Sequence, residues 1–436
     1  MEKIYIETYG CQMNFADSEV VGSILRSAGH ELTGSVDGAD FVLINTCAIR
    51  DNAEQRVRHR VRELRAAQGR NKSLRIGILG CMAERLQSRL MAEEDNVSFV
   101  CGPDAYRRLP QLLAQVREGQ RGAEVELSTT ETYADIEPVR MASNGISAYI
   151  SIMRGCQNYC SYCVVPYTRG RERSRDPQTI VAEAKGLYEN GYREVTLLGQ
   201  NVNSYHHDSV GFPELIAMVA EVSPSLRVRF ATSHPKDLSD KLLEVMASHE
   251  NICRCIHLPV QSGSNRMLKA MNRKYTVEWY LDRVDAIRRY MPDCSITTDV
   301  IAGFCGESLE DHAATLELFR RVRYDYAYMF KYSQREGTYA AKHMPDDIAD
   351  EEKTRRLNEI IALQGQIALE NNRKEVGREY EVLVEGESHR SKEQLFGRNS
   401  QNKVLVFDRK DAVPGTYRKV RVTDCTAATL IGELTS

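Results

Sequence analysis

Short apolar runs alternate with longer amphipathic stretches over the first 120 residues. The runs have the length of buried strands, and the longer stretches have the spacing of helices packed on one face. The predicted strands are 4–8, 41–45 and 75–79, and the predicted helices are 18–28, 52–68 and 83–92. Strand–helix alternation predicts a parallel sheet with covering helices. We therefore expect an N-terminal Rossmann-like parallel α/β domain over residues 1–121.

The same alternation returns in the middle of the chain, over residues 142–372. The predicted strands there are 149–153, 195–198, 228–231, 254–258, 295–301 and 326–331. Since eight such units close a full barrel, six predict an open, partial (β/α)6 barrel with its chemistry at the carboxyl ends of the strands. The acidic stretch 346–352 introduces a last long helix, which we expect to end near Asn372.

The two remaining segments differ from both α/β regions. Residues 122–137 contain five acidic residues and no Lys or Arg, which is typical of an exposed linker, and we assign the linker to 122–141. Residues 373–436 show only short apolar runs, at 382–384, 403–407 and 418–422, between Gly and Pro turns. This pattern predicts a small all-β barrel.

Composition places the chain among ordinary water-soluble proteins. Hydrophobic residues make up 42% and charged residues 27%. No apolar run approaches the ~20 residues that span a bilayer, and the chain starts Met-Glu-Lys-Ile-Tyr without a basic and apolar leader. We expect a cytoplasmic monomer without membrane contact, whose cysteines are reduced.

Positive charge is concentrated in three patches, although the formal net charge is −3. Residues 54–75 hold eight basic and two acidic residues, residues 169–175 hold four arginines, and residues 388–421 hold nine basic and three acidic residues. Three separate patches on a mildly acidic chain suit a polyanion held at defined points. The alternative, a solvated helix face, stays open.

Three cysteines share one short loop at the spacing C-x3-C-x2-C: Cys156, Cys160 and Cys163. A closed zinc site takes four protein ligands, whereas three thiolates suit a [4Fe-4S] cluster with one iron open to a substrate. The loop follows the first predicted barrel strand, where barrel chemistry lies. A zinc site completed by His206 or His207 is the alternative, and a disulfide is a weaker one.

A second group of three cysteines follows the predicted strands of the first domain. Each of these strands runs directly into one of them: Cys11, Cys47 and Cys81. Because the carboxyl ends of parallel strands lie at one edge of a sheet, we expect these thiols to converge into a second three-thiolate site. Three buried core cysteines would be the alternative.

The chain resembles the radical S-adenosylmethionine (SAM) methylthiotransferases over its whole length. The C-x3-C-x2-C loop with Tyr162 is typical of radical SAM enzymes, and the last domain resembles the tRNA-binding TRAM domain. Further matching segments are 8–14, 45–50, 79–85, 165–171, 198–203, 257–264 and 332–338. One departure is Cys305, where family members usually carry proline.

The resemblance implies an enzyme that converts N6-(dimethylallyl)adenosine at position 37 of tRNA, next to the anticodon, to its 2-methylthio derivative. Segments 11–14 and 199–203 favour this branch of the family. Implied cofactors are two [4Fe-4S] clusters and SAM, used twice per turnover. Implied partners are the tRNA anticodon stem-loop, an external low-potential electron donor and a sulfur or cluster donor.

Other functions remain open at this point. The same chemistry could act on threonylcarbamoyl-adenosine in tRNA or on an aspartate of a ribosomal protein. A third alternative is a non-enzymatic RNA-binding protein whose cysteines hold a structural metal.

The predicted site residues fall into three sets. The six cysteines named above are the catalytic and metal-binding residues. The predicted SAM contacts are Tyr162, Gly199, Gln200, Ser233, His257, Gln261, Asp299 and Gly303. The predicted RNA contacts are Arg169, Arg171, Arg173, Arg175, Arg390, Lys392, Arg398 and Lys403. For His257 and Asp299, a structural hydrogen bond inside the barrel is the alternative.

Overall fold

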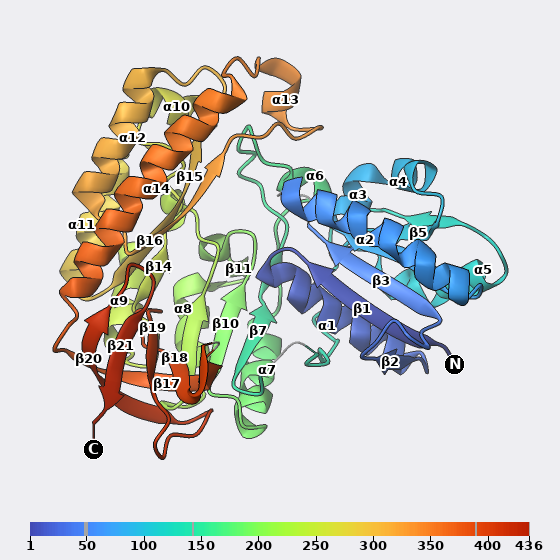
Figure 1. Ribbon diagram of the computed structural model, residues 1–436, viewed down its shortest axis with the longest axis horizontal. Coiled ribbons are helices and arrows are strands. Elements are labelled where there is room, and N and C mark those ends of the chain that lie inside the picture. Colours follow the sequence, from blue (N-terminus) through green and yellow to red (C-terminus); the bar gives the residue numbers. More distant parts are fainter. Residues whose placement is uncertain (48–50, 142–143, 389, 436) are drawn as a thin grey trace.

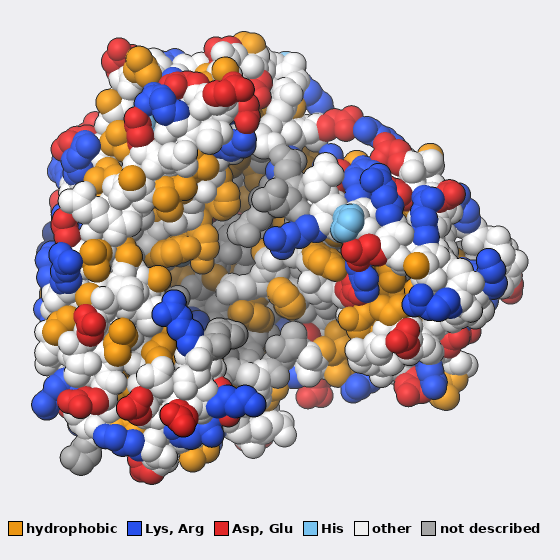
Figure 2. All heavy atoms as spheres, viewed as in Figure 1, with side chains coloured by type: hydrophobic (Ala, Val, Ile, Leu, Met, Phe, Trp, Pro, Cys, Tyr) orange, Lys and Arg blue, Asp and Glu red, His pale blue; other side chains and the backbone are white. Residues whose placement is uncertain are grey.

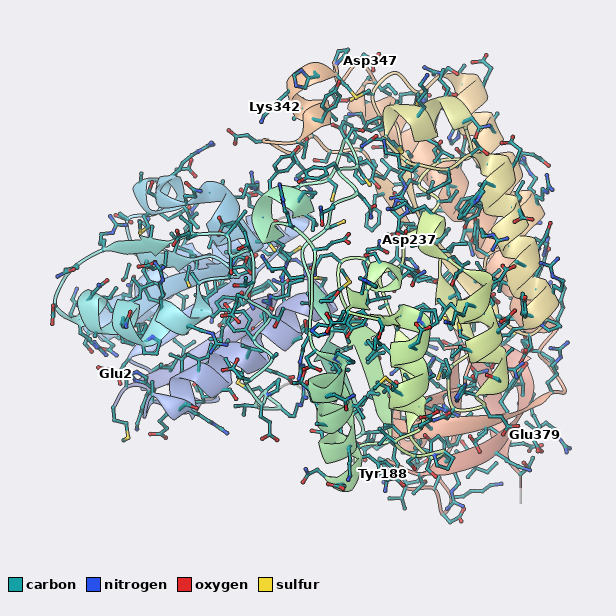
Figure 3. The ribbon with its side chains drawn as sticks, turned by 180° about the vertical axis from the view of Figure 1, so that it is seen from behind. Glu2, Tyr188, Asp237, Lys342, Asp347 and Glu379 are labelled. Carbon is teal, nitrogen blue, oxygen red and sulfur yellow. The ribbon has the colours of Figure 1, made fainter. Side chains whose placement is uncertain are left out.

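The computed structural model describes residues 1–47, 51–141, 144–388 and 390–435. Ala48 to Arg50, which belong to one of the matching segments, lie outside the described residues. The chain forms two lobes, with the N-terminal domain in one and the middle domain and C-terminal barrel in the other (Figure 1). Seen from behind, Glu2 and Glu379 lie at opposite sides of the molecule, with Asp237 between them (Figure 3).

The N-terminal domain is a parallel sheet with the strand order β2-β1-β3-β4-β5-β6. Its strands are β1 Lys3–Tyr9, β2 Glu31–Thr33, β3 Phe41–Thr46, β4 Arg75–Gly80, β5 Val97–Cys101 and β6 Gly122–Glu124. One face packs against α1 (Gln12–Ser27) and α5 (Leu109–Arg117). The other face packs against α2 (Asp51–Arg70), α3 (Cys81–Leu86) and α4 (Ser88–Glu93).

The predicted α/β class of this domain is confirmed, with differences in detail. The prediction omitted β2, β5 and β6. Two of these are only three residues long, too short to leave a periodic signal. The predicted helix 83–92 is two helices, because Gln87 has φ 50 and interrupts the α-helical backbone.

The middle domain places six parallel strands in two groups, β7-β10-β13 and β14-β15-β16. They are β7 Ser147–Ser151, β10 Glu194–Leu198, β13 Arg227–Phe230, β14 Cys255–His257, β15 Ser295–Ala302 and β16 Tyr326–Lys331. The outer helices are α7 Pro177–Glu189, α8 Phe212–Ala220, α9 Asp240–Ser248, α11 Val277–Tyr290, α12 Leu309–Val322 and α14 Asp350–Arg373. Every predicted strand start lies within two residues of the observed one. No ladder joins β16 to β7 within the described residues, so the barrel is open as predicted.

Short elements complete the middle domain. They are β8 Met153–Arg154, β9 Arg173–Ser174, β11 His206–His207, β12 Val210–Gly211, α6 Val165–Arg169, α10 Asn265–Ala270 and α13 Tyr339–His343. The strand pair β8 and β9 and the helix α6 surround the loop with the three clustered cysteines. Helix α6 also contacts α3 of the N-terminal domain, so this part of the chain lies next to that domain.

The C-terminal domain is a closed barrel with the order β17-β18-β19-β21-β20. Its strands are β17 Glu379–Ser388, β18 Ser391–Arg398, β19 Val404–Asp408, β20 Tyr417–Cys425 and β21 Leu430–Leu434. The prediction of a small β-barrel is confirmed, although it omitted β18 and β21. The barrel packs against the amino ends of the middle strands, where Nη1 of Arg227, the first residue of β13, donates to the Arg398 carbonyl (2.6 Å). Nowhere in the ranges that the structure describes is a helix long and apolar enough to cross a membrane.

Candidate active site

The cysteine loop of the middle domain is fixed by close backbone contacts. Gly155 has φ +81, and a Cβ there would lie 1.9 Å from the Arg171 carbonyl oxygen. Only glycine fits this approach. The Cys156 amide donates to the Gly170 carbonyl (3.1 Å), and the Cys163 amide donates to the Cys160 carbonyl (2.9 Å). The loop is therefore held against the segment that follows α6.

A buried guanidinium group places positive charge beside one of the cysteine sulfurs of this loop. Arg273 Nη1 lies 3.3 Å from Cys160 Sγ, and its Nη2 donates to the Pro259 carbonyl (2.8 Å). Burial raises the pKa of Cys156 to about 11 and also raises the pKa of Cys163. Thiolates at these positions therefore need a positive partner, which a metal cluster or an arginine supplies.

The second cysteine group gathers at the carboxyl edge of the N-terminal sheet. β1, β3 and β4 are neighbours in register, and Cys11, Cys47 and Cys81 follow their last residues. A Cβ at Gly10 would lie 2.7 Å from Cys47 Cβ, so glycine allows the strand ends to approach closely. A hydrogen bond from Cys47 lowers the pKa of Cys11 to about 6. The structure thus brings these thiols to one edge, as predicted.

This group also has a buried arginine, and it comes from the middle domain. Arg169 Nε lies 3.1 Å from Cys81 Sγ, and its Nη2 donates to Asp17 (2.7 Å). Asp17 also accepts two hydrogen bonds from Arg154 (2.6 and 2.9 Å). These side chains are all nearly inaccessible to solvent. Asp17 therefore ties two arginines of the middle domain to α1 of the N-terminal domain.

A loop after β16 makes a second bridge between the domains. Glu336 forms an ion pair with Arg89 of α4 (3.0 Å). Burial lowers the pKa of the neighbouring Arg335, and the nearby Cys47 opposes this shift. The matching segment 332–338 thus reaches the cysteines of the N-terminal domain from the opposite side of the middle domain.

Predicted SAM residues lie at the carboxyl ends of the first strands. Gln200, which follows Gly199 after β10, accepts a hydrogen bond from the Gly155 amide (2.5 Å). Tyr162 packs its ring edge-on against Phe304 at 6.3 Å. These residues border the cysteine loop, so the structure brings this part of the predicted set together.

Two further predicted SAM contacts, His257 and Asp299, lie on β14 and β15. His257 Nε2 is 3.3 Å from Asp299, and its Nδ1 is 2.9 Å from the Thr297 hydroxyl. The Ser233 hydroxyl donates to the His257 carbonyl. The structure thus contains the hydrogen bonds inside the barrel that were the alternative for His257 and Asp299. The side chains of His257 and Asp299 nevertheless remain partly accessible on the inner face of the strands.

The last two predicted SAM residues have backbone roles. Gln261 has φ 71, and its amide donates to the Asp299 carbonyl (2.9 Å). Gly303 has φ +71, and a Cβ there would lie 2.4 Å from Lys353 Cγ. Lys353 of α14 therefore occupies the position that a side chain at residue 303 would take.

Three of the predicted RNA-binding arginines are interior residues, which corrects that part of the prediction. Arg169, Arg173 and Arg175 are buried. Arg173 pairs with Asp104 (2.9 Å) and Arg175 with Glu183 (2.5 Å). The charge pattern indicated a surface, but these guanidinium groups bind carboxylates of the domain interface and of α7.

The other predicted RNA contacts lie nearer the surface. Arg171, Arg390 and Lys392 are exposed. Arg398 and Lys403 are half-buried; Arg398 pairs with Glu385 of the barrel (2.6 Å), and Lys403 pairs with Asp325 of the middle domain (3.1 Å). Only the first three side chains are therefore open to a ligand in this structure.

The remaining cysteine predictions can also be placed. All twelve cysteines lie in described ranges and are free thiols, so no disulfide forms. His206 and His207 form the short strand β11, and no three Cys, His, Asp or Glu side chains of the described residues are arranged to hold a metal ion. Cys305 is buried with Phe304 and Tyr332. Sequence reasoning missed Asp17, Arg154 and Arg273, because no motif marks a residue whose role depends on burial.

Three family models match the chain. Residues 3–102 match an uncharacterized protein family, UPF0004, residues 150–319 match the radical SAM superfamily, and residues 373–435 match the TRAM domain. Curated relatives match nearly the whole chain. A tRNA-2-methylthio-N(6)-dimethylallyladenosine synthase of Bacteroides fragilis is 55% identical over 99% of this chain and 95% of its own length. The chain belongs to this synthase family.

Other members of the synthase family match equally broadly. The Phocaeicola vulgatus synthase is 55% identical over 99% of this chain and 96% of its own length. The Porphyromonas gingivalis synthase is 53% identical over 99% of this chain and 95% of its own length. The chain is therefore an enzyme with a radical SAM domain and a TRAM domain, as predicted.

Solved structures show the same fold at low sequence identity. The radical SAM methyltransferase TsrM from Kitasatospora setae, with cobalamin and a [4Fe-4S] cluster bound, matches with a TM-score of 0.60 and 14% identity over 78% of this chain and 77% of that chain. The cobalamin-dependent radical SAM enzyme OxsB matches with a TM-score of 0.53 and 12% identity. The match covers 84% of this chain and 56% of that chain. At this identity the likeness supports the fold of the synthase family and no detail of its site.

Proposed function

We propose that this protein converts N6-(dimethylallyl)adenosine at position 37 of tRNA to its 2-methylthio derivative. The observation that carries the proposal is the pair of cysteine groups on two domains, each with a buried arginine beside one sulfur. The relatives at 55% identity are synthases of this nucleoside, which supports the substrate. The family relationship supports methylthio transfer over the alternative of a structural metal in an RNA-binding protein.

We propose that Cys156, Cys160 and Cys163 hold one iron–sulfur cluster and that Cys11, Cys47 and Cys81 hold the other. Three thiolates leave one position of a [4Fe-4S] cluster free, and buried guanidinium groups suit an anionic cluster. Arg169 Nη1 is buried without a hydrogen-bond partner. When bound, the clusters and two SAM molecules supply the electron, the adenosyl radical, the sulfur and the methyl group.

The chain's own residues position these reagents. Arg273 and Arg169 each donate toward one cysteine sulfur, which fixes the side chain and stabilises negative charge. We propose SAM contacts at the carboxyl ends of the barrel strands. They are Tyr162, Gly199, Gln200, Ser233, His257, Gln261, Asp299 and Gly303. The ion pairs of Asp17 hold the two cysteine groups in one orientation.

The RNA would contact exposed basic residues, of which Arg171, Arg390 and Lys392 are the remaining candidates. We propose domain limits of 1–121, 122–141, 142–372 and 373–436. The reaction also needs an external low-potential electron donor and a sulfur or cluster donor. We propose that the enzyme acts in the cytoplasm, where it would meet a tRNA substrate, and that it acts as a monomer.

The test is one anaerobic reaction of the reconstituted full-length protein with SAM, a reductant and tRNA that carries dimethylallyl-adenosine. The RNA is digested and analysed by mass spectrometry for the methylthio nucleoside, and the small molecules are analysed for 5′-deoxyadenosine. We expect both products. A parallel reaction with threonylcarbamoyl-adenosine tRNA should give neither methylthio product nor substrate-dependent turnover. If 5′-deoxyadenosine formed without the methylthio nucleoside, the substrate assignment would be wrong.

A further inference from the structure

The last strand of the open barrel presents two tyrosines to solvent. On β16, Tyr326 is 51% exposed and Tyr328 is 46% exposed, whereas Ala327 between them is 1% exposed. Alternate residues of a strand point to opposite faces. One face of β16 therefore packs into the core, and the other presents aromatic rings. Two exposed tyrosines on one barrel strand call for an explanation, because burying such rings would stabilise the fold.

Ring contacts place these tyrosines on the inner face of the barrel. Tyr328 lies opposite Asp299 in the β15–β16 ladder, and its ring is 5.8 Å from the ring of His257 on β14. Tyr326 packs edge-on against Tyr328 at 5.0 Å. His257 in turn lies 3.3 Å from Asp299. The two rings thus continue a polar and aromatic surface across β14, β15 and β16.

The ends of this strand contact the two other domains. Asp325, directly before Tyr326, pairs with Lys403 of the C-terminal barrel (3.1 Å). Beyond β16, the loop with Glu336 reaches Arg89 of the N-terminal domain. The tyrosines therefore lie between the barrel and the cysteine sites. Figure 2 shows a hollow between the two lobes, with hydrophobic side chains on its left side, where Figure 1 places the middle domain.

We propose that Tyr326 and Tyr328 form a stacking surface for unpaired bases of an RNA loop. Single-stranded RNA is recognised by aromatic rings that stack on splayed bases, together with basic side chains on the phosphates. Arg390 and Lys392 are exposed on the barrel that adjoins one end of β16. The inference rests on the proposed function, since it assigns the loop of the tRNA substrate to this face and the stem to the basic barrel.

The test compares the affinity of full-length protein for two RNA probes at one fixed salt concentration. The first probe is a fluorescent anticodon stem-loop, and the second is the same stem as a continuous duplex without the loop. We expect Tyr328→Ala and Tyr326→Ala to weaken loop binding roughly five- to a hundredfold, because stacking on an aromatic ring contributes this much per base. Duplex binding should stay within about twofold for both variants.

Two matched variants separate stacking from general damage. Tyr328→Phe keeps the ring and should retain loop binding. Tyr290→Ala removes a tyrosine of the outer helix α11, whose hydroxyl donates to Glu244, and should bind both probes like the unmodified protein. The iron content and the unfolding temperature of each variant show whether it is folded. The proposal is overturned if both alanine variants, folded, bind the stem-loop as tightly as the unmodified protein.

The outcomes distinguish this inference from the proposed function. If the unmodified protein makes the methylthio nucleoside while the alanine variants bind the loop normally, the stacking surface is wrong and the function stands. If the unmodified protein makes no such nucleoside while the alanine variants lose loop binding, the stacking surface stands and the reaction assignment is wrong.

Discussion

The loop that carries Cys156, Cys160 and Cys163 and the sheet edge that carries Cys11, Cys47 and Cys81 differ in how the chain gathers three sulfurs. The loop does so within eight residues, by backbone contacts that need Gly155. The sheet edge does so by joining three strands in register. Local sequence is sufficient for the first arrangement, whereas the second depends on the folded domain.

The arginines beside the two cysteine groups show the same contrast between a local and a long-range contact. Arg273 belongs to the same domain as Cys160, but Arg169 reaches Cys81 from another domain, 88 residues further along the chain. The comparison teaches that the loop site is complete within one domain and that the sheet-edge site is complete only when two domains dock.

The largest expected effect separates the two sites by their products. Cys160→Ala should reduce 5′-deoxyadenosine and methylthio nucleoside to the level of a protein-free control, because SAM cleavage would need the cluster that we propose for this loop. Cys47→Ala should retain 5′-deoxyadenosine and lose the methylthio nucleoside. Each variant should lose about four iron ions per chain. A Cys47→Ala protein that still made the methylthio product would contradict the assignment of the second site.

The next effect concerns the docking of the domains. Asp17→Ala leaves Arg154 and Arg169 buried without their carboxylate, and it should lower the free energy of unfolding by about 3–5 kcal/mol. Denaturant unfolding followed by circular dichroism measures this change. The control is Asp240→Ala, which removes an exposed pair with Arg283 (2.6 Å) and should cost less than about 1 kcal/mol. Equal losses for both variants would show that the buried network adds no stability.

A smaller effect depends on pH and is confined to the sheet-edge site. Glu84 lies one turn after Cys81 in α3, and burial raises its pKa to about 7. A carboxyl whose pKa is raised by folding contributes stability that is present below its unfolded pKa near 4.5 and is lost as the pH rises through 7. We therefore expect a loss of about 2 kcal/mol between pH 5 and 7.5.

Unfolding experiments across this pH range test the prediction, with Glu84→Gln as the matched variant. The amide has the shape of the carboxyl and does not titrate, so the stability of this variant should vary less with pH. If the stability of Glu84→Gln varied with pH as much as that of the unmodified protein, the pH dependence would belong to other groups.

The smallest effect compares the two arginines directly. Arg169→Gln should shift the midpoint potential of the sheet-edge cluster, and Arg273→Gln that of the loop cluster, each by on the order of 50 mV to more negative values. The cause is the loss of a positive charge beside a cysteine sulfur. Electron paramagnetic resonance during a redox titration would resolve the two proposed clusters. An Arg169 variant that shifted only the loop cluster would contradict the separation of the sites.

The sequence predicted the loop site more completely than its surroundings. The cysteine spacing and the strand–helix alternation are local patterns, so they predicted both cysteine groups and the three-domain fold. The prediction failed for Arg169, Arg173 and Arg175, because a run of arginines has the same appearance whether it faces solvent or a neighbouring domain. Asp17 and Arg273 were missed for the same reason, since their roles arise from contacts between residues far apart in the chain.

The position of Arg169 in the chain has a consequence for biosynthesis. Cys11, Cys47 and Cys81 leave the ribosome before Arg169 is translated, whereas Arg273 follows the loop cysteines within their own domain. The N-terminal thiols therefore remain without their guanidinium partner until the later domain has emerged and docked.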